Sequence, residues 1–489
     1  MASDNIMTRT RSWRRAVAAT AAAVIALALG VVAPSLAATA AVTSSGPVFT
    51  HAGYDYAPTV IEENGVRKMW WCGEATTDGY LSDAIFYREQ NISTGSLSPI
   101  QQVLTPRPSI ATWDKSYICD PSVVKGSFTN PDDGKTYTYA LYYTATDRGP
   151  GNPAYYGTHL DGTNNRIGVA WSNDGVAWKK YSQNPVISPR VVNTDAYGAG
   201  QATSYNAGGS SVRVTYHDNS TAGTSLYTRT STNGRTFGAE TLVSLTGLAP
   251  SGQLSYGSNF DVAYKPSEGM WYGTFPLPRR DAGDRETYRM VIAKIPAASF
   301  PSGTWQKLGF IDSNRTGAYL NHSPGIARTG SGEVSTASSG LTVLYSGGAN
   351  SPGTWDLRVA KWSATPATAA LNRYYNAAAV RHQVTTGPPT GGGVFEETLG
   401  YLPQAPTGSA VPLYGCKFLG EDYFVALDEN CEGHSELGIN GYIYPSAPTG
   451  VASKRIYRCY TGQDHFVSDE SNCEGVKVEA ALGFILVNP

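Results

Sequence analysis

The feature that most constrains the fold is a pattern of strands and turns that recurs five times between residues 55 and 365. Each copy has a short start motif, a β-branched strand, a turn and then an aromatic strand, as in residues 57–73 (APTVIEENGVRKMWWCG). The other copies begin at Asp120, Gly200, Asn259 and, more loosely, His322. Self-similarity of this kind indicates that one supersecondary unit is used several times.

Second hairpins complete some of these units. Residues 166–181 and 225–240 contain the turns Asn-Asp-Gly and Thr-Asn-Gly between alternating strands, which are strong hairpin signals. Four strands in about sixty residues or more describe a propeller blade. A chain with 31 Tyr and 53 Gly suits many short strands joined by tight turns. We therefore predict an all-β chain with a five-bladed β-propeller over residues 41–365, in which the first strand of each blade lines the axis.

A different repeat follows from Leu371 onward. Its three copies start at Arg373, Pro412 and Arg455, and they end in the similar segments LGYL, NGYIY and LGFIL. Each unit is too small to bury a core alone. We predict that residues 366–489 form a small β-rich, trefoil-like accessory module that binds glycan or the cell envelope, after a linker at residues 363–370.

The six cysteines fall into local pairs. The second and third copies of the C-terminal repeat each hold two cysteines and both contain Cys-Glu-Gly, which leaves two cysteines in the propeller. No pair has the two-residue spacing of a zinc knuckle, so we expect no metal site. The predicted disulfides are Cys72 with Cys119, Cys416 with Cys431, and Cys459 with Cys473.

The first forty residues have the pattern of an export signal. Four arginines precede an uncharged run at residues 16–33, and small residues suited to cleavage follow. We predict a signal peptide over residues 1–40, an extracellular mature protein and no stable membrane insertion after cleavage. The alternative is a membrane anchor, for which the run has the minimum length.

The charge balance narrows the class of partner. The formal net charge is −2 and 16% of the residues are charged, so no excess of positive charge favours binding to nucleic acid. We expect a neutral ligand such as a polysaccharide or oligosaccharide, no cofactor, and a monomer.

Three start motifs resemble the inner strands of known enzymes. The motif DPSVV at Asp120, the motif APTV with Asp55 beside it, and SNFD ending at Asp261 look like those of five-bladed glycoside hydrolases, the group of arabinanases, arabinofuranosidases, β-xylosidases and fructosidases. The resemblance covers roughly residues 50–365. It implies an axial pocket with Asp55 as the base and with Asp120 orienting and tuning the acid.

Strand periodicity supports one pocket for these carboxylates. When the strand valines are aligned, Asp55 lies two residues before the Asp120 position and Asp261 two residues after it, and an offset of two keeps one face of a strand. Cleavage of a glycoside needs one carboxyl group as proton donor and another to activate water or to attack the sugar. We predict that the three carboxylates converge; the alternative for each is a turn residue that caps backbone amides.

The sequence departs from this family at the expected acid. Gln201 stands where a glutamate of the third blade is expected, and a carboxamide cannot donate a proton as an acid does. Glu74, Asp218 and His322 are the candidates for the missing group, each with the alternative of a structural polar residue. Gln201, Trp71 and Trp113 are candidates for substrate binding, because aromatic faces stack on sugar rings.

The predicted function is an exported glycoside hydrolase that acts on arabinose- or xylose-containing polysaccharide or oligosaccharide. A phosphorylase or transferase would need a phosphate or acceptor site, for which the sequence offers only Arg279 and Arg280. The third alternative is a non-catalytic, lectin-like propeller, which Gln201 in place of an acid favours.

Overall fold

The computed structural model describes residues 41–488 except residues 52, 108–111, 147–164, 192–195, 221–224, 249–258, 278–288, 337–339, 350–354, 364–367, 405–406, 419 and 421. The predicted signal peptide, Ser258 of the SNFD motif, and Arg279 and Arg280 lie outside these residues. No helix in the described part of the chain is long and apolar enough to span a membrane.

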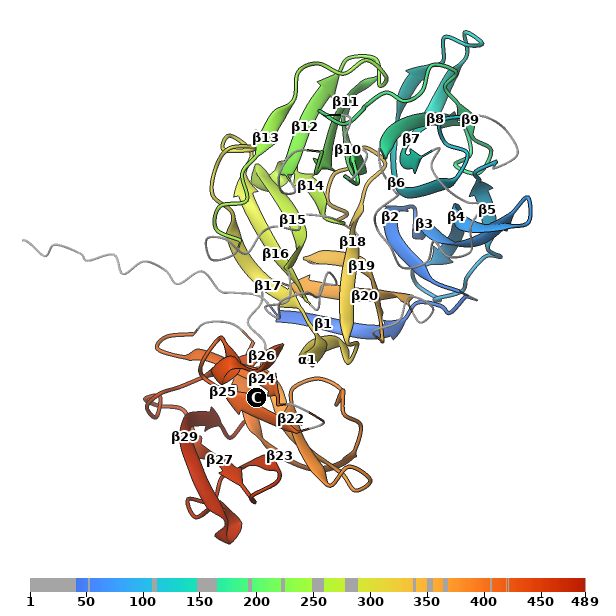
Figure 1. The fold of residues 1–489 in the computed structure, drawn as a ribbon. Helices are drawn as coiled ribbons and strands as arrows, with labels where there is room; N and C mark the ends of the chain where they lie inside the picture. Colours follow the sequence, from blue (N-terminus) through green and yellow to red (C-terminus); the bar gives the residue numbers. More distant parts are fainter. Residues whose placement is uncertain are drawn as a thin grey trace, which may run out of the picture. The chain divides into compact units, whose positions relative to one another are not determined.

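Five four-stranded antiparallel sheets surround a common centre (Figure 1). Blade 1 comprises β2 (Asp55–Glu63), β3 (Val66–Thr77), β4 (Tyr80–Asn91) and β5 (Gln101–Leu104); blade 2 comprises β6 (Tyr117–Thr129), β7 (Thr136–Thr146), β8 (Arg166–Ser172) and β9 (Lys179–Lys180). Blade 3 comprises β10 (Ala199–Gly208), β11 (Ser211–Asp218), β12 (Ser225–Ser231) and β13 (Thr241–Val243); blade 4 comprises β14 (Asp261–Lys265), β15 (Met270–Leu277), β16 (Arg289–Pro296) and β17 (Gln306–Ile311). Blade 5 comprises β18 (Leu320–Arg328), β19 (Leu341–Gly348), β20 (Asp356–Ser363) and β1 (Ala41–Pro47). The chain is therefore a five-bladed β-propeller, as the repeat predicts.

The two ends of the propeller close on each other. Strand β1 precedes blade 1 in the sequence but pairs antiparallel with β20 as the outer strand of blade 5. The inner strands β18 and β2 also pair in parallel over a short stretch, with Ala327 opposite Val60. Closure of this kind leaves only short, protected sheet edges.

The propeller core lies between the blades. Each of five clusters of buried hydrophobic residues joins two adjacent blades. Trp70 belongs to the cluster between blades 1 and 2, and Trp71 to the cluster between blades 5 and 1. Neighbouring tryptophans on one strand thus cover opposite faces, as strand alternation requires.

The C-terminal module consists of three units of three strands each. They are β21 (Thr368–Asn376), β22 (Arg381–Thr385) and β23 (Val394–Pro403); β24 (Val411–Lys417), β25 (Tyr423–Ala426) and β26 (Ser435–Ile443); β27 (Ser453–Tyr460), β28 (His465–Ser468) and β29 (Lys477–Leu486). In each unit the first strand pairs with the other two, and its register with the third strand shifts twice. Leu371, Leu413 and Ile456 bring the three units into one core. The three predicted disulfides are all present, which confirms the pairing.

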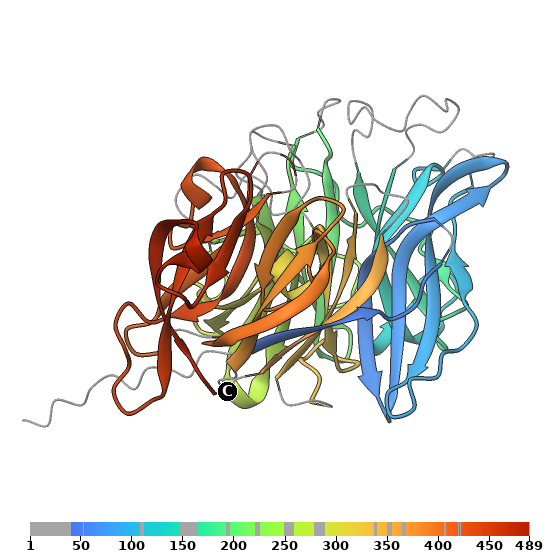
Figure 2. The same cartoon turned by 90° about the horizontal axis from the view of Figure 1, so that it is seen from below.

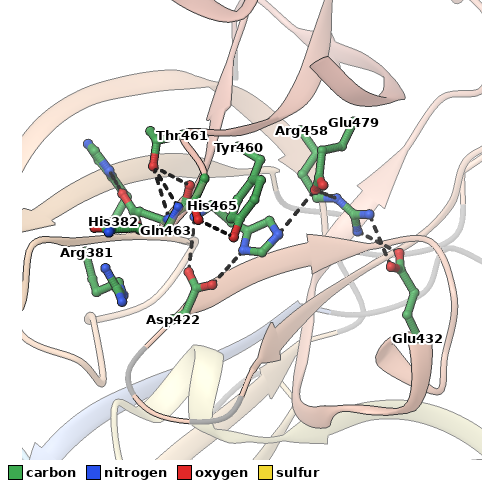
Figure 3. A network of polar contacts seen from close by, with 12 residues as sticks. Arg381, His382, Asp422, Glu432, Arg458, Tyr460, Thr461, Gln463, His465 and Glu479 are labelled. Carbon is green, nitrogen blue, oxygen red and sulfur yellow. Dashed lines mark hydrogen bonds and ion pairs between the residues drawn. The ribbon is translucent and has the colours of Figure 1, made fainter. Parts of the chain in front are cut away.

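Two junctions between these units carry the same polar set, one of which Figure 3 shows. The Asp422 carboxylate lies 2.7 Å from Nδ1 of His465, whose Nε2 lies 3.2 Å from Glu479. At the next junction Asp464 lies 2.5 Å from Nδ1 of His382. The arginine pairs repeat as well: Arg458 with Glu432 at 2.6 Å, and Arg373 with Glu474 at 2.8 Å.

The propeller contacts the C-terminal module through β26 of the second unit. Helix α1 (Ser313–Thr316) follows β17, and Nδ2 of Asn314 donates to Gly438 O at 2.9 Å. Arg315 donates to Ile439 O at 2.6 Å. Since β20 ends at Ser363 and β21 begins at Thr368, only a short connection joins the two parts. That the module folds independently stays a prediction.

We expect Asp422→Ala to weaken the module locally. Asp422 accepts hydrogen bonds from both the backbone N–H and Nδ1 of His465, so its removal leaves two groups of a mostly buried junction unpaired, at a cost of about 2 kcal/mol. Amide hydrogen exchange of residues 453–486 measures the loss. Asp469→Ala is the control: this exposed residue only pairs with Lys454 on the surface, and such pairs contribute little. Equal exchange in both variants would contradict the role of the junction.

Candidate active site

The inner strands of the five blades share one unusual backbone position. Ala57, Asp120, Gln201, Asn259 and Ser323 have φ values of 48°, 47°, 52°, 54° and 50°. Left-handed backbone in residues other than glycine costs energy and gathers at functional sites. These five residues line a single axial pocket of about 20 Å³. This common position also lies two residues after Asp55 and two before Asp261, as the alignment of the motifs predicts.

Asp120 is the ionisable residue among these five equivalents. It is 6% exposed, and the Tyr197 hydroxyl donates to its Oδ2 at 3.2 Å. Burial, supported by the negative charge of Asp83, raises the pKa of Asp120 to about 7. A carboxyl group with this pKa exists in both protonation states near neutrality, as a general acid or base requires.

A second carboxyl group lies close to Asp120 and was not predicted. Asp83 on β4 is partly exposed and accepts hydrogen bonds from the hydroxyls of Tyr54 and, at 3.0 Å, Tyr56. Burial raises the pKa of Asp83 to about 6. Strand pairing brings it to the site, because Asp83 stands opposite Glu74 of β3.

The Cys72–Cys119 disulfide joins β3 to β6. Strand β6 carries Asp120, and β3 pairs with β4, which carries Asp83. A carboxylate oxygen of Asp83 and both sulfur atoms lie within 4.8 Å of one another, and Oδ1 of Asp120 lies 3.6 Å from Cys119 Sγ. Both sulfurs are used by the disulfide, so this group is not a thiolate metal site. The disulfide holds β3 and β6, and with them the surroundings of the two carboxyl groups.

Asp55 is buried beside the pocket rather than in its lining. It is 0% exposed, and Nε1 of Trp71 donates to its Oδ1 at 2.6 Å. His51 lies 3.4 Å from the same oxygen. Burial raises the pKa of Asp55 to about 6. Trp71 is itself 0% exposed, so its ring has no free face for a sugar and its contact is with Asp55.

Asp261 lines the axial pocket, but its carboxylate is bound by groups of neighbouring strands. Its carboxylate forms an ion pair with the buried Arg328 and accepts hydrogen bonds from the Thr203 hydroxyl at 2.6 Å and the Ile326 N–H at 2.6 Å. These partners come from blades 3 and 5. Asp261 therefore ties three inner strands together at the pocket.

Gln201 and Asp218 are also held by backbone groups. The Gln201 carboxamide oxygen accepts from the Asn259 N–H at 2.7 Å, which joins blades 3 and 4 at the pocket. Asp218 accepts from the N–H groups of Arg190 and Ser220, each at 2.8 Å. Asp218 thus matches the turn-capping alternative, away from the pocket lining.

The other candidates, His322, Glu74 and Trp113, are not among the residues that line the axial pocket. His322 packs edge-on against Trp355 with ring centres 4.4 Å apart, and burial lowers its pKa to about 4, so that it is neutral at pH 7. Glu74 is partly buried and lies opposite Asp83. Trp113 is partly buried and stacks on Tyr143 at 5.8 Å, between blades 1 and 2.

Comparison with known proteins gives structural matches alone. No protein-family model and no curated protein sequence matches the chain. Among solved structures, it is similar to the catalytic domain of a GH62 α-L-arabinofuranosidase from Coprinopsis cinerea, with 13% identity over 67% of this chain and 98% of that one, and a TM-score of 0.45. It is also similar to an endo-arabinase from Bacteroides thetaiotaomicron, with 12% identity over 65% of this chain and 97% of that one, and a TM-score of 0.42. A fructan 1-exohydrolase from Cichorium intybus is similar with 9% identity over 70% of this chain and 60% of that one, and a TM-score of 0.41. The assignment of the fold rests on the strand pairing described above.

The described site therefore contains three buried or partly buried carboxyl groups with raised pKa values. Asp120 lines the axial pocket, Asp83 lies beside the Cys72–Cys119 disulfide, and Asp55 is fully buried and accepts a hydrogen bond from Trp71. Two carboxyl groups whose environments give them different pKa values are the chemical requirement for acid and base roles.

Proposed function

We propose that the propeller is a glycoside hydrolase in which Asp120 donates the proton and Asp83 acts as the base. The supporting observation is the pair of raised pKa values, about 7 for Asp120 and about 6 for Asp83, beside one axial pocket. Near pH 6.5 the major form of the pair has a protonated Asp120 and an ionised Asp83. This is the state that glycoside cleavage uses.

This assignment differs from the one that the resemblance implies. Asp55 was the expected base, but its Oδ1 accepts from Trp71 and its side chain is 0% exposed, whereas Asp83 is partly exposed. Asp120 was the expected tuning group, yet it lines the pocket, where the other carboxylate, Asp261, is paired with Arg328. The Gln201 carboxamide is held by the Asn259 N–H. Asp83 replaces Asp55 in the proposal because the tyrosine hydroxyls orient it beside Asp120.

The proposed substrate is a neutral polysaccharide or oligosaccharide with arabinose or xylose units. The balanced charge of the chain supports a neutral ligand, and the resemblance of the start motifs supports these sugars. Export and an extracellular location are part of the proposal, supported by the N-terminal sequence and by three disulfides, which persist in oxidising compartments. A glycan-binding role for the C-terminal module belongs to the same proposal.

A panel of arabinan, arabinoxylan, xylan and fructan, with chromatography of the released sugars, tests the proposal. Release of arabinose or xylose, or of short oligomers, is the expected result. A non-catalytic, lectin-like propeller is the second candidate, which the uncharged side chains at four of the five equivalent axial positions favour. Retained glycan binding without any release would establish that alternative.

We expect kcat/KM to have a bell-shaped dependence on pH with its maximum between about 6 and 7. Ionisation of Asp83, with a pKa of about 6, produces the acidic limb, and loss of the proton from Asp120, with a pKa of about 7, produces the basic limb. Because the two groups interact, the limbs report the pair as a whole. Initial rates between pH 4 and 9 on the released-sugar assay measure the profile. A rate that stays constant from pH 5 to 8 would contradict the assignment.

A further inference from the structure

A second, larger cavity lies in the propeller away from the axial pocket. Its volume is about 330 Å³, and it lies between blades 3 and 4 at the hairpin ends of their first two strands. Gln201 and Tyr205 lie on the same strand β10, but Gln201 faces the axial pocket and Tyr205 lines this cavity. Small-molecule sites typically have volumes of about 300–1,000 Å³. The cavity is thus large enough for one sugar ring.

Three aromatic rings form its wall. Tyr205 meets Trp271 and Tyr264 edge-on, with ring centres 5.4 and 5.6 Å apart, and Tyr264 lies 5.2 Å from Trp271. Trp271 is 6% exposed, whereas both tyrosines are partly exposed. Large rigid rings of this kind present apolar faces with a polar edge. They suit a ligand with one apolar face and several hydroxyl groups.

Arg213 brings a positive charge without a counterion to the same cavity. Its guanidinium lies over the ring of Phe300 at 5.8 Å, and its Nη1 reaches the Thr228 hydroxyl at 3.4 Å. Within the described residues, no carboxylate lies within ion-pair distance of it. Partial burial lowers the pKa of Arg213, and a partly desolvated charge without a counterion is costly. An anion in the cavity would remove that cost and form charge-assisted hydrogen bonds.

In the described part of the chain, Arg229 on the neighbouring strand β12, unlike Arg213, is paired with a carboxylate. Its guanidinium pairs with Glu240 at 2.5 Å and donates to the Tyr216 hydroxyl at 2.9 Å. Burial and, to a lesser extent, the negative charge of Glu333 raise the pKa of Tyr205 in the cavity wall. Glu333 forms no ion pair with Arg213. The guanidinium of Arg213 is therefore available to an anionic ligand.

We propose that this cavity is a second, non-catalytic binding site for a sugar unit that carries a carboxylate, a uronic acid residue of a polysaccharide. The sugar ring packs on Tyr205 and Tyr264, and the carboxylate binds the guanidinium of Arg213. The exposed hydroxyls of Thr230 and Thr232, which also line the cavity, face the sugar hydroxyls. The site holds a polysaccharide away from the axial pocket, and it does not depend on the proposed hydrolysis.

Calorimetric titration of the full chain with trigalacturonate and with uncharged galactotriose tests the site. We expect tighter binding of trigalacturonate, with a preference that falls as salt is added. Arg213→Gln removes about tenfold or more of the affinity for trigalacturonate and leaves that for galactotriose unchanged. Tyr205→Ala weakens both. Arg235→Gln, in the same blade but outside the cavity lining, and Asp120→Asn bind as the unchanged protein does.

Two results would overturn the proposal. If Arg213→Gln binds trigalacturonate as tightly as the unchanged protein, Arg213 does not recognise the carboxylate. If benzoate binds to Arg213 more tightly than trigalacturonate does, the cavity takes an aromatic acid and not a sugar. Because Asp120→Asn lowers the rate of the proposed hydrolysis by about a hundredfold or more but leaves this binding unchanged, failure of one proposal is distinguishable from failure of the other.

Discussion

Asp120→Asn lowers the rate of sugar release by about a hundredfold or more while the propeller stays folded. The asparagine keeps the size of the side chain and its hydrogen bond with Tyr197, but it removes the proton that the leaving oxygen needs. Initial rates at pH 6.5 measure the loss. Asp132→Asn, in an exposed turn, keeps the full rate.

The same substitution stabilises the fold at high pH. Burial raises the pKa of Asp120 from 3.8 to about 7, so the folded state prefers the protonated form. The stability due to this group is fully present below pH 4 and is lost as the pH rises through 7. Asp120→Asn therefore gains about 4 kcal/mol in unfolding free energy at pH 8, from a pKa raised by about three units at about 1.36 kcal/mol each, measured by urea denaturation. A variant with normal turnover and unchanged stability would leave Asp120 as a turn residue.

Asp83→Asn produces the second large effect, a loss of about a hundredfold in the rate. It removes the group that must be ionised in the active form, so the acidic limb of the pH profile disappears as well. Initial rates of sugar release between pH 4 and 9 show both changes.

The variant Tyr56→Phe tests whether Asp83 is the catalytic base or a carboxylate with a structural role. The Tyr56 hydroxyl donates to Asp83 at 3.0 Å and so lowers the pKa of Asp83, against the larger effect of burial. Without this hydrogen bond the pKa of Asp83 rises, and the acidic limb moves to higher pH while part of the activity remains. An acidic limb that stays in place would show that another group produces it.

Local patterns in the sequence were sufficient for the architecture. The start motifs and the Asn-Asp-Gly and Thr-Asn-Gly turns predicted the blades. The Cys-Glu-Gly segments predicted two disulfides and, by elimination, the third. The alignment of valines placed Asp55, Asp120 and Asp261 in the correct register, because all inner strands share the backbone position occupied by Asp120.

The chemistry of the site depends on contacts between strands that no single motif contains. Asp83 lies on the third strand of blade 1 and reaches the site through its pairing with Glu74 and through Tyr56. Asp261 has the predicted position, but Arg328, from a blade later in the chain, uses its charge. Trp71 has the predicted aromatic ring, but the packing between blades 5 and 1 covers it.

A titration of the full chain with ¹³C-labelled aspartate side chains, followed by NMR of the carboxyl carbons, tests the proposed acid–base pair most directly. Assignment comes from the spectra of Asp83→Asn and Asp120→Asn. The structure predicts titrations near pH 6 for Asp83 and near pH 7 for Asp120. The titration of Asp120 moves to lower pH when the Asp83 carboxyl group is removed, because the negative charge of Asp83 raises the pKa of Asp120. If both groups titrate below about pH 4.5, near the ordinary value for aspartate, Asp120 cannot hold its proton at neutral pH and the proposed mechanism is contradicted.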